Sequence, residues 1–131
     1  MWKEIIICII IVTTITIGNN ITQNYSVESI ETLTSKLGEL KVEMNEKKKN
    51  IDNEKIQEKA NNIFNEWTQR YDKLAYYIEH DELEKVETNL TSLKSCIETN
   101  SFSEAVDELD KCTFVLKHIK DKYMFNLQNI F

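Results

Sequence analysis

Residues 1–20, MWKEIIICIIIVTTITIGNN, decide how the rest of the chain is interpreted. The apolar run Ile5–Ile17 alone is too short to cross a hydrocarbon layer of about 30 Å, which needs about twenty helical residues. A helix from Trp2 to about Thr22 is long enough, and tryptophan suits the membrane–water interface. The threonines inside the run are tolerated because their hydroxyls can bond back to helix carbonyls. The sequence therefore predicts one transmembrane anchor over residues 1–22.

Three other interpretations of this segment would lead to a different protein. A cleaved secretion signal needs small residues after the apolar run, and Thr16-Ile17-Gly18 fits that pattern poorly, so an uncleaved anchor is favoured. A lipoprotein signal would place its cysteine at the end of the run, whereas Cys8 lies near the beginning. A buried helix of a soluble protein is disfavoured because the run is apolar on every face.

The basic residues around the span predict its orientation. Lys3 and the amino terminus precede it, and the next basic residue is Lys36. By the positive-inside rule the N-terminus is cytoplasmic and the remaining chain is extracytoplasmic. We therefore expect a single-pass protein of the cell membrane.

Composition sets the fold class and excludes one kind of partner. The chain has no proline and only two glycines, Gly18 and Gly38, too few for the many turns of a sandwich or barrel. This favours an all-α protein. The net charge is −6, and the one basic run, residues 47–49, is flanked by acids. Since nucleic-acid binding needs clustered basic residues, no nucleic-acid partner is expected.

Residues 23–53 are expected to hold a short juxtamembrane stretch and then a helix with a heptad pattern. Ser26 is a candidate N-cap, and the helix would run from about 27 to 50. Its apolar residues form a narrow stripe of the coiled-coil kind, which suits either internal packing or self-association. The polar stretch that follows predicts a turn at 50–53, with one continuous rod as the alternative. The stripe consists of Ile30, Leu33, Leu37, Leu40, Met44 and Ile51.

Residues 54–131 are predicted to form an antiparallel three-helix bundle, so that the whole exported part is an up-down bundle of three to four helices. Short links make neighbouring helices antiparallel. Two capping boxes mark helix starts, one at Asp81 with Glu84 and one at Ser101 with Glu104. The expected buried residues are Ile56, Ala60, Ile63, Trp67, Tyr71, Leu74 and Ile78, then Leu83, Val86, Leu90, Leu93 and Ile97, then Ala105, Leu109, Cys112, Leu116, Ile119 and Tyr123.

Cys96 and Cys112 would lie in an oxidising compartment, which suggests a disulfide. Helix geometry argues against it. If the turn is centred near Asn100, the two cysteines differ by about 12 Å along the helix axes. A disulfide tolerates Cα separations of only about 7 Å. Both cysteines, and Cys8, are interpreted as small apolar residues.

His80, Glu82 and His118 are candidate metal ligands, because the same antiparallel register brings them toward one end of the bundle. A His/Glu group can bind a divalent cation. The favoured interpretation is structural, since the chain has no H-E-x-x-H motif and no third strong ligand. No cofactor is expected.

Trp67 and Arg70 are interpreted as structural residues. Arg70 is the only arginine, and it lies one helical turn from Trp67 near the apolar face. A guanidinium suits a partly buried pair with a carboxylate, for which Glu87, Glu108 and Asp110 are candidates. No nucleophile–base spacing, glycine-rich phosphate loop or CxxC appears, so we expect neither an enzyme nor a small-molecule substrate.

The order of several residues resembles a bacterial family of small membrane-anchored helical proteins, domain of unknown function 4363, found mostly in clostridia. The residues that carry the resemblance are Trp67, then His80-Asp81-Glu82-Leu83-Glu84, His118-Ile119 and Asn129-Ile130-Phe131. Tyr71 or Tyr77 stands where the family pattern has a second tryptophan. The resemblance implies no biochemical activity, and it is compatible with a membrane-protein partner.

Two functional hypotheses follow. The first is a structural or protein-interaction module of the envelope that docks on another membrane protein or on itself. The alternative is an extracytoplasmic sensor or metal-binding module that uses His80, Glu82 and His118.

Overall fold

The computed structural model describes residues 1–46 and 53–128, with side chains described over 1–45 and 53–123. It contains four helices, which confirms the all-α prediction for these residues. Their bounds are α1 Trp2–Glu46, α2 Asn53–Leu74, α3 His80–Glu98 and α4 Phe102–Gln128.

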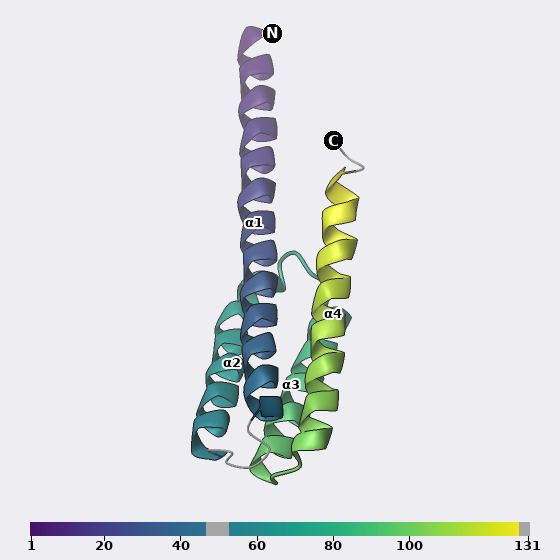
Figure 1. The fold of residues 1–131 in the computed structure, drawn as a ribbon. Coiled ribbons are helices and arrows are strands. Elements are labelled where there is room, and N and C mark those ends of the chain that lie inside the picture. The colour runs from purple at the N-terminus through teal and green to yellow at the C-terminus, as the bar shows by residue number, and fades with distance from the viewer. Residues whose placement is uncertain (47–52, 129–131) are drawn as a thin grey trace.

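The helices form an antiparallel four-helix bundle in which each packs against two neighbours (Figure 1). The packed pairs are α1–α2, α2–α3, α3–α4 and α4–α1, so the helices close into a ring around one core. Because α2 runs back alongside α1, the continuous rod is excluded. The predicted turn at 50–53 lies almost entirely outside the described residues, and α2 begins at Asn53.

The core is built from the apolar stripes that the sequence predicts. All the expected residues of the four stripes within the described side chains are buried, except Tyr71 and Tyr123, which are partly buried against the same core. The stripe of α1 contributes Ile30, Leu33, Leu37, Leu40 and Met44 to this core. The heptad pattern therefore serves internal packing, and burying it stabilises the bundle at about 25 cal/mol per Å² of apolar surface.

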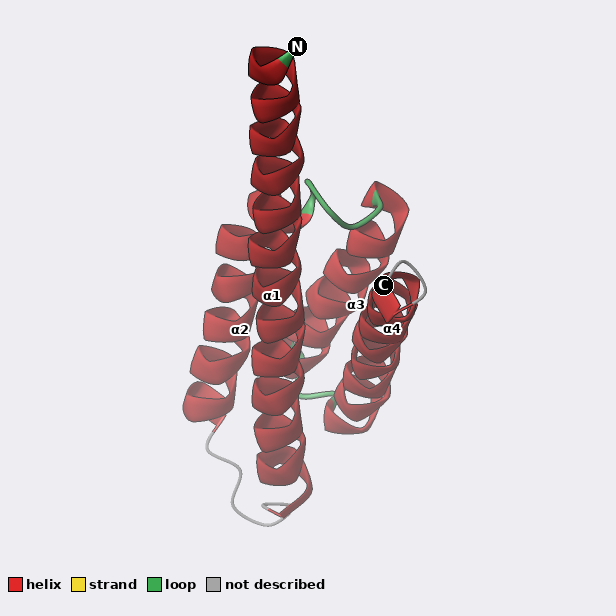
Figure 2. Cartoon of the chain, turned by 90° about the horizontal axis from the view of Figure 1, so that it is seen from above, coloured by secondary structure: helices red, strands yellow, loops and turns green. Residues whose placement is uncertain are grey.

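The first helix is continuous where a break was expected. Ser26 does not cap a new helix. It lies inside α1, and its hydroxyl donates to the carbonyl of Thr22 at 2.9 Å. Nothing in the segment forbids helix, since it has no proline and no glycine after Gly18 until Gly38. The predicted juxtamembrane break is therefore wrong, and the apolar segment and the bundle share one helix (Figure 2).

The two predicted capping boxes have different outcomes. α3 begins at His80, one residue before Asp81, and its N-cap Glu79 makes no side-chain capping bond, so the box at Asp81 is wrong. Ser101 does directly precede α4, and its carbonyl accepts the Ala105 N–H at 2.9 Å, as an N-cap carbonyl does, so the predicted helix start is confirmed. The contact that its hydroxyl makes is with the Thr99 hydroxyl at 3.2 Å, and this is not the bond of a capping box.

The link before α4 is a tight C-terminal cap on α3. Asn100 adopts a φ of 59°, a left-handed conformation that asparagine tolerates. The N–H of Ser101 donates to the Cys96 carbonyl at 2.8 Å, and that of Asn100 donates to the Ile97 carbonyl at 3.1 Å. These two bonds are those of a Schellman motif. They fix the reversal that sets α4 antiparallel to α3.

Candidate functional site

The N-terminal half of α1 projects from the bundle with no protein packed on it. Residues 1–21 are all exposed, and Ser26 is the first buried residue. The hydroxyls of Thr13, Thr14 and Thr16 donate to carbonyls four residues earlier at 2.7–2.8 Å, as expected for threonine in an apolar helix. By length and composition α1 can cross a membrane. We call the end of the bundle from which residues 2–21 project the anchor end.

Ion pairs between helices fix which residues lie at the anchor end. Along α1 and α2, Glu43 pairs with Lys59 and Lys36 pairs with Glu66. Continuing in the same direction brings the end of α2 and the turn at 75–79 beside the point where α1 leaves the bundle. Figure 1 shows this turn and the end of α4 at the anchor end. The matching α1–α4 pairs are Lys41 with Asp110 and Glu31 with Lys120, both at 2.8 Å.

Arg70 is the centre of a polar cluster between α1 and α2. Its Nε and Nη2 donate to Oε1 of Glu66 at 3.2 and 3.1 Å, and its Nη1 donates to Oγ of the buried Ser29 at 2.7 Å. Lys36 donates to the other oxygen of Glu66. The partner is therefore a carboxylate on the same helix, and the predicted partners Glu87, Glu108 and Asp110 were wrong.

The Glu66 carboxylate is held in its charged form. Its burial by itself raises the pKa, but the hydrogen bonds and positive charges of Lys36 and Arg70 outweigh burial and lower it below the usual value. The cluster thus joins α1 to α2 through charge-assisted hydrogen bonds, which are stronger than neutral ones.

Tyrosine rings gather around this cluster at the anchor end. The guanidinium of Arg70 and the ammonium of Lys73 lie 5.6 and 5.2 Å from the ring centroid of Tyr25, within cation–π range. The rings of Tyr77 and Tyr123 are 5.3 Å apart. Burial, and then the neighbouring Tyr123, raise the pKa of Tyr77, so it stays neutral.

A tyrosine also ties the fourth helix to the start of the third. The hydroxyl of Tyr123 accepts the backbone N–H of Glu79 at 2.9 Å. Glu79 is the N-cap residue of α3, and the first N–H groups of a helix have no partner within the helix, so this hydroxyl satisfies the Glu79 amide. The end of α4 and the turn at 75–79 are therefore held together.

The three candidate metal ligands are not gathered into a site. His80 uses both ring nitrogens elsewhere, with Nδ1 3.1 Å from the Tyr71 hydroxyl and Nε2 2.9 Å from Glu84 on the next turn. Glu82 is buried and lies 3.7 Å from the Lys122 ammonium, while His118 is exposed. Over residues 1–46 and 53–128, no group of three or more potential ligands could hold a metal ion.

The cysteines are free thiols, in agreement with the geometric argument against a disulfide. Cys112 is buried in the core, and burial raises its pKa to about 12, so it is inert. Cys96 is half-buried, and burial, followed by the charges of Glu104 and Glu108, raises its pKa. Cys8 is exposed on the projecting part of α1.

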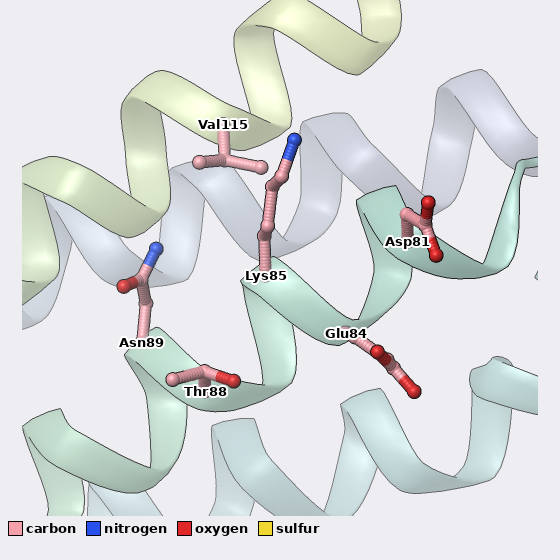
Figure 3. Close-up of a pocket in the computed structure, with 6 residues that line it drawn as sticks. All are labelled: Asp81, Glu84, Lys85, Thr88, Asn89 and Val115. Carbon is pink, nitrogen blue, oxygen red and sulfur yellow. The ribbon is translucent and has the colours of Figure 1, made fainter.

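A shallow groove of about 490 Å³ runs between α3 and α4 (Figure 3). Five residues of α3 and a single apolar residue of α4 line it, and Figure 3 shows Glu84 pointing away from the α4 side. Ligand pockets are usually concave and mainly apolar. This groove is shallow and open, so it lacks that enclosure. Its lining residues are Asp81, Glu84, Lys85, Thr88, Asn89 and Val115.

Two features of the anchor end were not predicted from the sequence: the polar cluster around Arg70 and the gathering of the tyrosines. Ser29 is completely buried although serine is usually exposed, and Glu66 lies four residues before Arg70, a spacing that places the two side chains on one helix face. That spacing could have predicted the pair of Glu66 and Arg70. No sequence pattern predicts that the tyrosines lie together, because their proximity depends on the register of the packed helices.

Comparison with known proteins identifies a family but no activity. No curated protein and no solved structure matches the chain. The family described as Domain of unknown function (DUF4363) matches residues 22–130, and the match begins where the fully exposed part of α1 ends. Since it covers most of the chain and agrees with the resemblance seen in the sequence, the protein belongs to the DUF4363 family.

Proposed function

We propose that the protein is a single-pass membrane protein whose bundle stands on the extracytoplasmic side as a structural or interaction module of the bacterial envelope. One observation carries the proposal. The first half of α1 is apolar and wholly exposed, while its second half is buried in the bundle core. Exposed apolar side chains in such a run are stable in a hydrocarbon layer and costly in water.

A non-catalytic role agrees with the distribution of polar groups. Several titratable groups at the anchor end are used in contacts within the bundle, such as Arg70 with Glu66 and His80 with Glu84. The groove between α3 and α4 is open, and polar or charged residues make up most of its lining. We therefore infer that the bundle acts through its surface, on another membrane protein or a further envelope component.

The orientation is inferred from charge. Lys3 precedes the span, and the residues between it and Lys36 include no basic side chain. Positive residues are retained in the cytoplasm, so the bundle is placed outside.

Cysteine labelling of intact bacteria tests both the anchor and its orientation. The parent variant carries Cys8→Ser, Cys96→Ser and Cys112→Ala. Glu98→Cys then places one thiol at the exposed far end of α3, and Lys3→Cys places one before the span. We expect a membrane-impermeant maleimide to label position 98 in intact cells and position 3 only after permeabilisation.

Two results would contradict the proposal. Labelling in the reverse pattern would place the bundle in the cytoplasm. A shortened product in the soluble fraction, lacking an N-terminal tag, would show that the apolar segment is a cleaved signal.

A further inference from the structure

We propose that the anchor end of the bundle binds the lipid headgroup layer through its tyrosines, with Tyr76 as the residue that enters the layer. The inference rests on the proposed membrane anchoring of α1 and adds a second contact with the same bilayer. The bundle would then lie against the membrane surface, instead of standing clear of it on a single helix.

The first observation is where the tyrosines lie. The chain has five tyrosines, and all of them are at the anchor end, contributed by α1, α2, the turn at 75–79 and α4. None lies in the part of the bundle farther from the projecting helix. Phenylalanine and leucine are spread along the bundle, so the gathering concerns the one aromatic residue with a hydroxyl. The five residues are Tyr25, Tyr71, Tyr76, Tyr77 and Tyr123.

The second observation is their level relative to the apolar span. Tyr25 is held by Arg70 and Lys73, so the end of α2 lies beside residue 25 of α1. The fully exposed part of α1 ends at Ile21, one helical turn away. If residues 2–21 cross the hydrocarbon layer, residue 25 and the adjacent turn at 75–79 lie at the depth of the headgroups, about one turn or 5–6 Å beyond the hydrocarbon edge.

Tyrosine suits this depth because its ring is apolar and its hydroxyl is polar. Tyrosine and tryptophan are accordingly enriched at both membrane–water interfaces. Tyr76 is 89% exposed on the turn between α2 and α3. Trp2, which is 83% exposed, stands at the other end of the apolar segment. The two aromatic residues thus bracket the span as the two interfacial belts do.

The neighbouring rings make Tyr76 a rigid anchor point. Tyr77 is half-buried and packs on Tyr123, whose hydroxyl holds the amide of Glu79. These contacts fix the turn after Tyr76, and before it the Ala75 N–H donates to the Tyr71 carbonyl at 2.9 Å. The Tyr76 side chain therefore enters the headgroup layer without ordering a mobile loop.

The charges around the turn indicate the kind of lipid contact. Lys73 and Lys122 are accompanied by Asp72, Glu79 and Asp81, so the surface is not a polybasic patch. Attraction to anionic lipid requires such a patch. We therefore assign the contact to uncharged or zwitterionic headgroups and expect it to depend little on salt.

Depth-dependent fluorescence quenching tests the inference on the full chain. In the parent variant without cysteines, Ala75→Cys carries an NBD fluorophore beside the intact Tyr76, and the protein is reconstituted in phosphatidylcholine vesicles. A nitroxide is placed either on the headgroup or at the middle of the acyl chain. We expect the headgroup nitroxide to quench the reporter about twofold more than the deep nitroxide.

Substitutions at position 76 separate the tyrosine from its position. Tyr76→Asp should remove most of the headgroup quenching, because a carboxylate is poorly accommodated at the apolar edge of the interface, and Tyr76→Phe should retain it. Phe114→Asp is the matched control. It also replaces an exposed aromatic residue, which is 73% exposed, but on α4 between the residues that pair with Lys41 and Glu31. It should leave the quenching unchanged.

A reporter at Ile10→Cys shows whether the span itself is inserted. Strong quenching of that reporter by the deep nitroxide, with none at position 75, would overturn the inference and leave the anchor standing. Absence of quenching at both positions would overturn the anchor as well. Equal quenching at position 75 in Tyr76→Asp and the parent would show that Tyr76 does not hold the bundle to the membrane.

Discussion

Arg70 joins two helices through groups that lysine cannot replace. Its guanidinium group donates hydrogen bonds to Ser29 on α1 and to Glu66 on α2 at the same time, and the Arg70 side chain is only 20% exposed. An ammonium is a compact charge and cannot span both partners. We expect Arg70→Lys to destabilise the protein by about 1–3 kcal/mol, the cost of hydrogen bonds lost at a partly buried site.

Thermal unfolding of the full chain in detergent, followed by circular dichroism, measures this change. Lys111→Ala is the control, since Lys111 is paired with Glu108 on the solvent-exposed side of α4, and no measurable change is expected. Equal effects of the two substitutions would show that the cluster contributes no more than a surface ion pair.

The Glu66 carboxylate should make stability depend on acid pH. Its pKa in the folded protein is lower than the usual value of 4.5, mainly because Lys36 and Arg70 overcome the effect of burial. The unfolded chain therefore takes up the proton first as the pH falls. The stabilisation is complete above about pH 4.5 and is lost as the pH falls through the folded pKa.

Unfolding temperatures measured between neutral and acid pH should therefore fall less steeply for Glu66→Gln than for the parent. The same substitution at the exposed Glu98 serves as control. A parent and a Glu66→Gln variant with parallel profiles would remove Glu66 as the cause.

Trp67 combines a large buried ring with an unused donor. It is 1% exposed, and no described residue accepts a hydrogen bond from its Nε1. Trp67→Ala should cost about 3–5 kcal/mol through the cavity it leaves. Trp67→Phe should cost clearly less, since it fills much of the volume and removes a donor that has no partner. The same thermal unfolding measures both, and equal losses would mean that the indole N–H is bonded in solution.

Two serines that look alike in the sequence have different positions in their helices. Ser26 is inside α1, so Ser26→Ala removes only a bond to the Thr22 carbonyl and should change stability by less than about 0.5 kcal/mol. Ser101 precedes α4, and Ser101→Ala should cost about 1 kcal/mol. Comparing the two unfolding temperatures tests whether α1 is continuous. A larger loss at Ser26 would indicate that a helix begins there.

The elements could be predicted from the sequence as far as periodicity determines them. Residues such as Leu33 and Leu90 recur at helical spacing, and burial follows from that spacing alone. The junction near Ser26 could not be predicted, because polar residues break an apolar run without breaking a helix. The N-cap of α3 was misplaced by two residues, since Asp81 matched a capping pattern while the observed N-cap is Glu79 and the helix begins at His80.

The candidate site was less predictable than the fold because it depends on how the helices are placed against one another. Periodicity puts Arg70 near the apolar face, but only the packed bundle shows that Ser29 lies opposite it. The same holds for Tyr77 and Tyr123, which are distant in sequence and meet through the antiparallel return of α4. His80 and His118 were brought toward one end by the same reasoning, but no metal-binding group results.

The four helices bury one another's apolar stripes, and this determines how the bundle should behave without the projecting segment. The stripe of α1 is used inside the molecule, so it is not free for self-association. Beyond the projecting segment, the exposed large apolar residues within the described side chains are Val42, Tyr76 and Phe114. Isolated residues of this kind do not form the contiguous apolar patch of several hundred Å² that marks a stable apolar contact between copies.

Residues 24–131 should therefore sediment as a monomer in analytical ultracentrifugation, even at high concentration. Leu37→Asp provides the contrast, because it places a charge in the core, opens the bundle and should produce association through the exposed stripes. A well-defined dimer of the unmodified fragment would contradict the expectation. If Phe114→Ser then abolished that dimer, the outer face of α4 would be the interface. If it did not, a further Leu37→Ala substitution would separate the two remaining cases: a dimer through another face of the intact bundle would survive it, whereas a dimer built from the released stripe of α1 would be weakened.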